Sequence, residues 1–269
     1  MVWRALYPIG IHFLISQAVA YAGRYFLVDR AGLERTAYNQ YAMMLTGITG
    51  LFALIPAMYF YKKDSAARAA GGIVPEKKAK PLSVLEYGMF LIMGAFLGIY
   101  GNLIVSPLKQ LTDSSAVYQE AMNAIMDGKS MLVMIFWIGI LAPLAEEAIF
   151  RWLIYLRLRD HMQIAGAAVL SGLLFGIFHM NLIQGVYALI LGAAFAMLME
   201  WRGRIASSAL LHMGANIASL LLGEYLPVVI EKGAYGIFMA IFMSGTLLAF
   251  AGIVICRRDY EKRGRKRSV

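Results

Sequence analysis

The amino-acid sequence predicts an all-α protein, a polytopic membrane helical bundle with about eight transmembrane helices. Hydrophobic residues make up 60% of the 269 residues and charged residues only 15%, whereas soluble domains are about 45–50% apolar and about 25% charged. Several apolar runs also reach the roughly 20 residues that a helix needs to cross the hydrocarbon core of a bilayer. The single cysteine, Cys256, excludes an internal disulfide framework and a cysteine-based zinc site.

The apolar runs place the expected helices along the chain. Segment 112–127 is too polar to cross the membrane and begins with residues that cap helices, so we expect it at the interface or in a loop. We expect one membrane domain over residues 1–269, with a motif-bearing core at 130–223. The helices are expected at residues 5–23, 40–61, 84–106, 131–156, 163–180, 183–200, 205–223 and 234–256.

Lysines and arginines gather in alternate connections between these helices, which predicts the orientation. They are concentrated in the loop 62–80, after the fourth helix, after the sixth helix and in the basic tail 257–269. All of these fall on one side if eight helices alternate, and the positive-inside rule makes that side cytoplasmic, together with both termini. The net charge of +9 is therefore expected to attract anionic lipids of the bilayer and not nucleic acid.

Three charged residues stand inside the apolar run of the fourth helix: Glu146, Glu147 and Arg151. A charge in a membrane helix costs roughly 3 kcal/mol on insertion scales, so the protein must use or neutralise these groups. Glu147 and Arg151 are four residues apart, with the acid nearer the N-terminus, which favours an ion pair. Glu146 points about 100° away from Glu147. We therefore expect Glu147 to be structural and Glu146 to be free for chemistry.

Further hydrogen-bonding residues lie in the fifth and seventh apolar runs. Phe175 and His179 are one turn apart in the fifth, while Ser208, His212 and Asn216 follow at intervals of four in the seventh. Each polar residue has a structural explanation by itself, because histidine or asparagine can hydrogen-bond a neighbouring helix and serine packs where helices approach closely. The same close approach explains the glycines Gly172, Gly176, Gly185 and Gly192.

A spare carboxylate, two histidines and an amide on three helices are together harder to explain by packing. A carboxylate shielded from bulk solvent can accept a proton from water, and a histidine can protonate a leaving amine. An asparagine amide and a histidine N–H can stabilise an oxyanion, and such donors are worth about 10²–10³ in rate elsewhere. The set can therefore hydrolyse an amide. It could also hold a divalent metal such as zinc through Glu146, His179 and His212, although the metalloprotease pattern HExxH is absent.

Three short motifs at these residues resemble those of the CPBP family of intramembrane proteases. That family includes type II CAAX-prenyl endopeptidases, bacteriocin-processing proteins and self-immunity proteins. Its motifs EExxxR, FxxxH and HxxxN correspond to Glu146-Glu147-Ala-Ile-Phe-Arg151, Phe175-Gly-Ile-Phe-His179 and His212-Met-Gly-Ala-Asn216. Their order and spacing match, and the resemblance covers about residues 130–223.

The resemblance implies a function and a role for each motif residue. It implies an endopeptidase that cuts a peptide or a membrane-associated, lipidated substrate in a cavity within the membrane, without a required cofactor, in a bacterial plasma membrane. Glu146 and His179 would activate water, His212 and Asn216 would stabilise the oxyanion, and Glu147, Arg151 and Phe175 would organise the site.

Two other functions remain open from the sequence. A non-catalytic immunity or regulatory membrane protein could use the same fold, and a transporter could use the carboxylates and histidines as a proton relay. The place of His179 at the far end of the fifth run adds a structural expectation. Because irregular backbone is tolerated where it faces a wet cavity, we expect the turn 180–184 to lie within the membrane thickness, facing the site.

Overall fold

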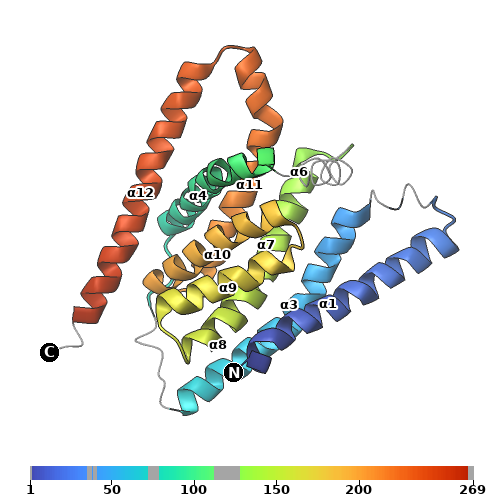
Figure 1. Ribbon diagram of the computed structural model, residues 1–269, viewed down its shortest axis with the longest axis horizontal. Coiled ribbons are helices and arrows are strands. Elements are labelled where there is room, and N and C mark those ends of the chain that lie inside the picture. The colour runs from blue at the N-terminus through green and yellow to red at the C-terminus, as the bar shows by residue number, and fades with distance from the viewer. Residues whose placement is uncertain (1, 35–37, 39–40, 72–78, 112–127, 266–269) are drawn as a thin grey trace.

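A computed structural model describes residues 2–34, 38, 41–71, 79–111 and 128–265 of the chain. These residues form helices joined by short connections, and no strand occurs among them (Figure 1). The all-α polytopic fold expected from the sequence is therefore confirmed. The segment 112–127, expected at the membrane interface, lies outside the described residues.

The helices follow the predicted order, and several run further than their hydropathy indicates. They are α1 (Val2–Arg24), continued by the π-helical η1 (Tyr25–Arg30), α3 (Ala42–Ala70), α4 (Val84–Leu111), a composite fourth helix over residues 131–159, α9 (Ile164–Phe178), α10 (Leu182–Arg202), α11 (Ile205–Glu231) and α12 (Tyr235–Arg265). Much of the expected loop 62–80 belongs to α3, and most of the expected tail 257–269 belongs to α12. Lysine, arginine and alanine are strong helix formers, so both helices continue after the apolar run ends.

The short helix α9 corrects the expected number of spans. Among the described residues, seven helices are long and apolar enough to cross a membrane, and α9 is not one of them. Its 15 residues cover about 22 Å, which is less than the roughly 30 Å of a hydrocarbon core. The chain turns after α9 at Met180, whose φ is 54°. Asn181 then starts α10, because its side chain accepts the N–H of Gln184.

The fourth helix, which carries the two glutamates, is not uniformly wound. It consists of α6 (Met131–Met134), the π-helical η3 (Ile135–Leu141), α7 (Ala142–Glu147), the π-helical η4 (Ala148–Tyr155) and α8 (Leu156–Arg159). π-helical turns inside α-helices often occur at functional sites. Here the two wide segments stand on either side of the short α7 that ends with Glu146 and Glu147, and every residue of η4 is buried.

Glycines bring two pairs of helices into close contact. In the α9–α10 hairpin, a Cβ atom on Gly176 would lie 2.5 Å from the backbone oxygen of Gly185, and one on Gly172 would lie 2.7 Å from that of Leu189. Between α4 and α11, a Cβ atom on Gly94 would overlap the backbone of Leu211. No side chain fits at these crossings. The close approach expected at Gly172, Gly176 and Gly185 is confirmed.

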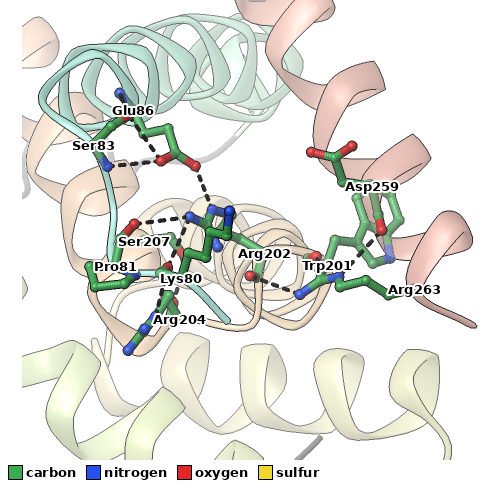
Figure 2. A network of polar contacts seen from close by, with 10 residues as sticks. All are labelled: Lys80, Pro81, Ser83, Glu86, Trp201, Arg202, Arg204, Ser207, Asp259 and Arg263. Carbon is green, nitrogen blue, oxygen red and sulfur yellow. Dashed lines mark hydrogen bonds and ion pairs between the residues drawn. The ribbon is translucent and has the colours of Figure 1, made fainter. Parts of the chain in front are cut away.

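Polar contacts tie helix ends together where basic residues are concentrated (Figure 2). At the start of α4, the Ser83 N–H donates to the Glu86 carboxylate at 2.8 Å and the Glu86 N–H donates to Ser83 Oγ at 3.3 Å, a reciprocal capping box. Glu86 also pairs with Arg202 at the end of α10, with 2.6 Å between Oε1 and Nε. Arg263 of α12 donates to the backbone carbonyls of Trp201 and Arg202. These contacts hold α4, α10 and α12 together.

A second network joins α1, α3 and the end of the fourth helix. Asp64 of α3 is only 6% exposed, and it accepts from Arg157 Nε at 2.6 Å and from Arg4 Nη2 at 3.0 Å. An ion pair of 3.2 Å between Arg159 and Glu200 connects this region to the end of α10. The basic helix ends that the sequence predicts on one side of the membrane thus lie at one end of the bundle.

Candidate active site

The expected ion pair of the fourth helix is present and fully buried. Arg151 Nη1 lies 3.2 Å from Glu147 Oε1, and neither side chain is exposed. The guanidinium lies over the ring of Phe175 from α9, with 4.4 Å between the guanidinium carbon and the ring centroid. Gly192 of α10 makes room for this arrangement, because a Cβ atom there would overlap Arg151 Nη2. Two motifs, EExxxR and FxxxH, thus meet at one buried cation.

His212 of α11 lies between the two glutamates of the fourth helix. Its Nδ1 is 3.0 Å from Glu147 Oε1, and its Nε2 is 3.6 Å from Glu146 Oε2. Arg151 is always protonated and holds Glu147 as a carboxylate, which only accepts hydrogen bonds, so His212 Nδ1 carries the proton and donates it. This bond fixes the orientation of the imidazole, and the other ring nitrogen faces Glu146.

The two neighbouring carboxylates differ in their access to solvent. The side chain of Glu147 is fully buried, whereas that of Glu146 is 21% exposed. The exposure rises along the series Arg151, Glu147, His212, Glu146, so only the last member is open to water or substrate. This arrangement matches the expected division into one anchored and one available carboxylate.

His179 lies one ring away from His212 and has a different partner. Its Nδ1 is 2.8 Å from the backbone oxygen of Phe175, and because a carbonyl only accepts, this nitrogen carries the proton. In the neutral ring Nε2 is then an acceptor. The Phe175 ring lies between the two histidines, with centroid distances of 4.6 Å to His179 and 5.6 Å to His212. The histidine directly beside Glu146 is His212, whereas the resemblance pairs Glu146 with His179.

Asn216 joins α11 to the fourth helix through a backbone carbonyl. Its amide donates to the Ile138 oxygen at 3.0 Å. In π-helical winding this oxygen would pair with the N–H five residues on, which is position 143, and Pro143 has no N–H. The N–H of Ala142, the α-helical alternative, donates to Trp137 instead. Asn216 therefore supplies a donor that the backbone lacks, and the interhelical bond left open for it from the sequence is present.

Ser208 and a metal site at Glu146, His179 and His212 are the other features that the sequence allows here. Ser208 is buried and donates to the Ile205 carbonyl of its own helix at 3.0 Å, which fits the packing explanation. In the described part of the chain, no three histidine, cysteine or acidic side chains are gathered closely enough to hold a metal ion. Glu146, His179 and His212 do not form such a group in this arrangement.

A third histidine near the site, His12, is absent from the residues that the sequence predicts for it. It belongs to α1, its ring contacts Phe178 with 5.0 Å between centroids, and it interacts electrostatically with Glu146. A histidine within the apolar run 5–23 is the same signal that marks His179 and His212. His12 belongs to none of the three motifs, and only the packing of α1 brings it next to Phe178.

The same ring contact bears on the turn between α9 and α10. It sets Phe178, the last residue of α9, beside His12, and α1 continues from His12 to Arg24. These 12 further residues correspond to about 18 Å of helix. The end of α9 is therefore far from the end of α1, which supports a turn inside the bundle. Its depth in the bilayer stays a prediction.

The fold and the site together define a class of protein: a multi-pass integral membrane protein with a buried carboxylate–histidine centre. Residues 128–218 match the family model described as type II CAAX prenyl endopeptidase Rce1-like. This stretch is therefore similar to the Rce1-like domain, in agreement with the resemblance of its three motifs to the CPBP family. The match includes all three motifs and leaves α1, α3, α4 and α12 outside. No curated protein and no solved structure matches the chain.

Proposed function

We propose that this protein is an intramembrane endopeptidase that hydrolyses a peptide bond with water activated by Glu146. The observation that supports this most directly is the position of His212 between an anchored carboxylate and an accessible one. A buried ion pair that only stabilised the bundle would need neither a histidine bound to Glu147 nor a second carboxylate beside it. General acid–base chemistry requires both, since one group must take a proton and another must return it.

The buried side chains of Arg151, Glu147 and His212 position a proton partner for the accessible carboxylate of Glu146. Arg151 neutralises Glu147, and Glu147 fixes the His212 ring with Nδ1 protonated. His212 Nε2 and Glu146 Oε2 can then share one proton across a gap that closes by less than 1 Å to reach hydrogen-bond distance. This arrangement lets Glu146 pass a proton to His212 and take it back.

The reaction follows from these positions. A water molecule bound to Glu146 gives up a proton as its oxygen bonds to the carbonyl carbon of the substrate. His179 Nε2, an acceptor in the neutral ring, helps to orient that water. The amide of Asn216 has two N–H groups, so its bond to Ile138 leaves one for the developing oxyanion. The proton shared by Glu146 and His212 then passes to the amine nitrogen as the C–N bond breaks.

The proposal extends to the surroundings of the site. The basic end of the bundle faces the cytoplasm and contacts anionic lipids, because the positive-inside rule applies to these helix ends. Arg4 near the start of α1 and Arg263 near the end of α12 both belong to this end of the bundle, so both termini then lie on the cytoplasmic side. The carboxylates, histidines and amide supply a base, an acid and an oxyanion donor, so the reaction needs no cofactor, and activity should survive dialysis against EDTA.

The test uses the full chain purified in detergent and reconstituted in liposomes. The matching family is named for CAAX prenyl endopeptidases, so the first probes are a farnesylated CAAX peptide and its unprenylated form, followed by a panel of membrane peptides. Glu146→Gln should lower turnover by roughly 10²–10⁴, whereas Glu224→Gln, an identical change at an exposed residue of α11, should not. Native turnover by Glu146→Gln would refute the role of Glu146. Absence of turnover of every probe by the native protein would refute the proposed function.

A further inference from the structure

The three histidines inside the bundle are connected by two phenylalanines. The centroid distances along this row are 5.0 Å from His12 to Phe178, 6.0 Å from Phe178 to His179, 4.6 Å from His179 to Phe175 and 5.6 Å from Phe175 to His212. His212 is next to Glu146 at one end of the row, and His12 interacts with Glu146 from the other end. Both ends of the row are therefore within electrostatic reach of the accessible carboxylate.

His12 lies on the side of α1 that faces the protein. Ala5, Ile9 and Ile15, which share this side at helical spacing, belong to or pack against the main apolar core. The opposite side is exposed, as Leu14 shows with 68% of its surface accessible. His12 is thus a polar residue in the apolar stripe by which α1 packs against the core.

Packing against Phe178 accounts for the ring of His12 but not for its nitrogens. A phenylalanine would make the same edge-to-face contact. Within the described residues no hydrogen bond to His12 is present, and the residue is only partly buried, so its nitrogens can bind a water molecule.

We infer that the His12 imidazole is a further catalytic residue, which hydrogen-bonds the attacking water beside Glu146. This inference rests on the proposed function and extends its active site to α1, outside the residues that match the family model. Glu146 takes the proton of the water, while His12 holds the water oxygen in line with the carbonyl carbon. A general base is effective only when the water is oriented, and a displacement of about 1 Å can cost about 10²-fold in rate.

The test compares two substitutions at His12 with one at the remaining histidine of the chain. His12→Phe keeps the ring contact with Phe178 and removes the nitrogens, whereas His12→Gln keeps a hydrogen-bonding group of similar reach. His161, which is exposed on the turn before α9, provides the matched control His161→Phe. Turnover of whichever peptide the native protein cleaves gives kcat and KM, and thermal unfolding in detergent reports folding.

We expect His12→Phe to lower kcat by about 10²-fold with KM within a factor of about two, because the substrate itself is still bound. His12→Gln should recover at least about a tenth of the native kcat, and His161→Phe should resemble the native protein. Equal kcat in His12→Phe and native protein would overturn the inference and leave His12 as a packing residue. So would a loss that appears in KM or in the unfolding midpoint and not in kcat.

These outcomes separate the inference from the function on which it rests. If the native protein turns over substrate, Glu146→Gln does not, and His12→Phe does, only the role of His12 fails. If Glu146→Gln retains activity, the proposed active site itself is wrong.

Discussion

Replacing Arg151 with methionine tests whether the buried ion pair organises the site. Methionine has a similar length and no charge, so Arg151→Met keeps much of the packing and leaves Glu147 buried without its cation. At the 3.2 Å between the two charged groups, and with an effective dielectric constant of about 20, the attraction is about 5 kcal/mol. Removing one partner of a buried pair typically costs about 3–5 kcal/mol. We therefore expect Arg151→Met to lower the free energy of unfolding by about 3–5 kcal/mol.

A double-mutant cycle separates the ion pair from general packing. Glu147→Gln alone leaves Arg151 without its anion and should also destabilise the protein. In the double variant no unpaired charge remains, so its loss should be smaller than the sum of the single losses by about 1–3 kcal/mol. Unfolding in mixed micelles with a rising fraction of SDS, followed by circular dichroism, measures all four proteins. If the two single losses simply add, the two groups are not coupled and our reading of the buried pair is refuted.

Two further predictions concern the frame around the site. Gly94→Ala should destabilise the protein by about 1–3 kcal/mol because a Cβ atom there overlaps the Leu211 backbone. Gly88→Ala on the same helix, where nothing lies within 4 Å, should change stability by less than about 1 kcal/mol. The same unfolding assay compares the two variants, and equal effects would contradict the packing of α4 on α11. Asp64→Asn should lower the free energy of unfolding by about 3–5 kcal/mol because it breaks a buried ion pair. Asp259→Asn, at an exposed pair, should lower it by less than about 1 kcal/mol. A small effect at Asp64 would show that the α1–α3 network does not stabilise the bundle.

Local spacing made part of the site predictable from the sequence. Glu147 and Arg151 are on one helix and four residues apart, so their distance depends little on the rest of the fold. The contact between Glu146 and His212 depends on how α11 crosses the fourth helix. Nothing in the spacing of either helix gives that crossing, and the family resemblance pairs Glu146 with His179 instead.

Hydropathy predicted the helices but not their exact lengths. It detects where a chain becomes apolar, so it counted α9 among the eight expected spans and could not show that α9 stops short of a full crossing. It also ended α3 and α12 at their first charged residues, although helix propensity carries both further. The π-helical winding around Pro143 depends on a donor from α11, Asn216, and is therefore visible only once the two helices are packed.

The space at Gly192 makes two distant positions of the chain depend on each other in size. Arg151 occupies the volume that a side chain on α10 would need, so position 192 can become larger only where position 151 becomes shorter. Natural relatives should obey this exchange, with alanine or serine at 192 accompanied by a smaller residue in place of the arginine. A relative that combines a larger residue at 192 with the arginine must move α10 outward or shift the guanidinium from its place over the Phe175 ring of α9.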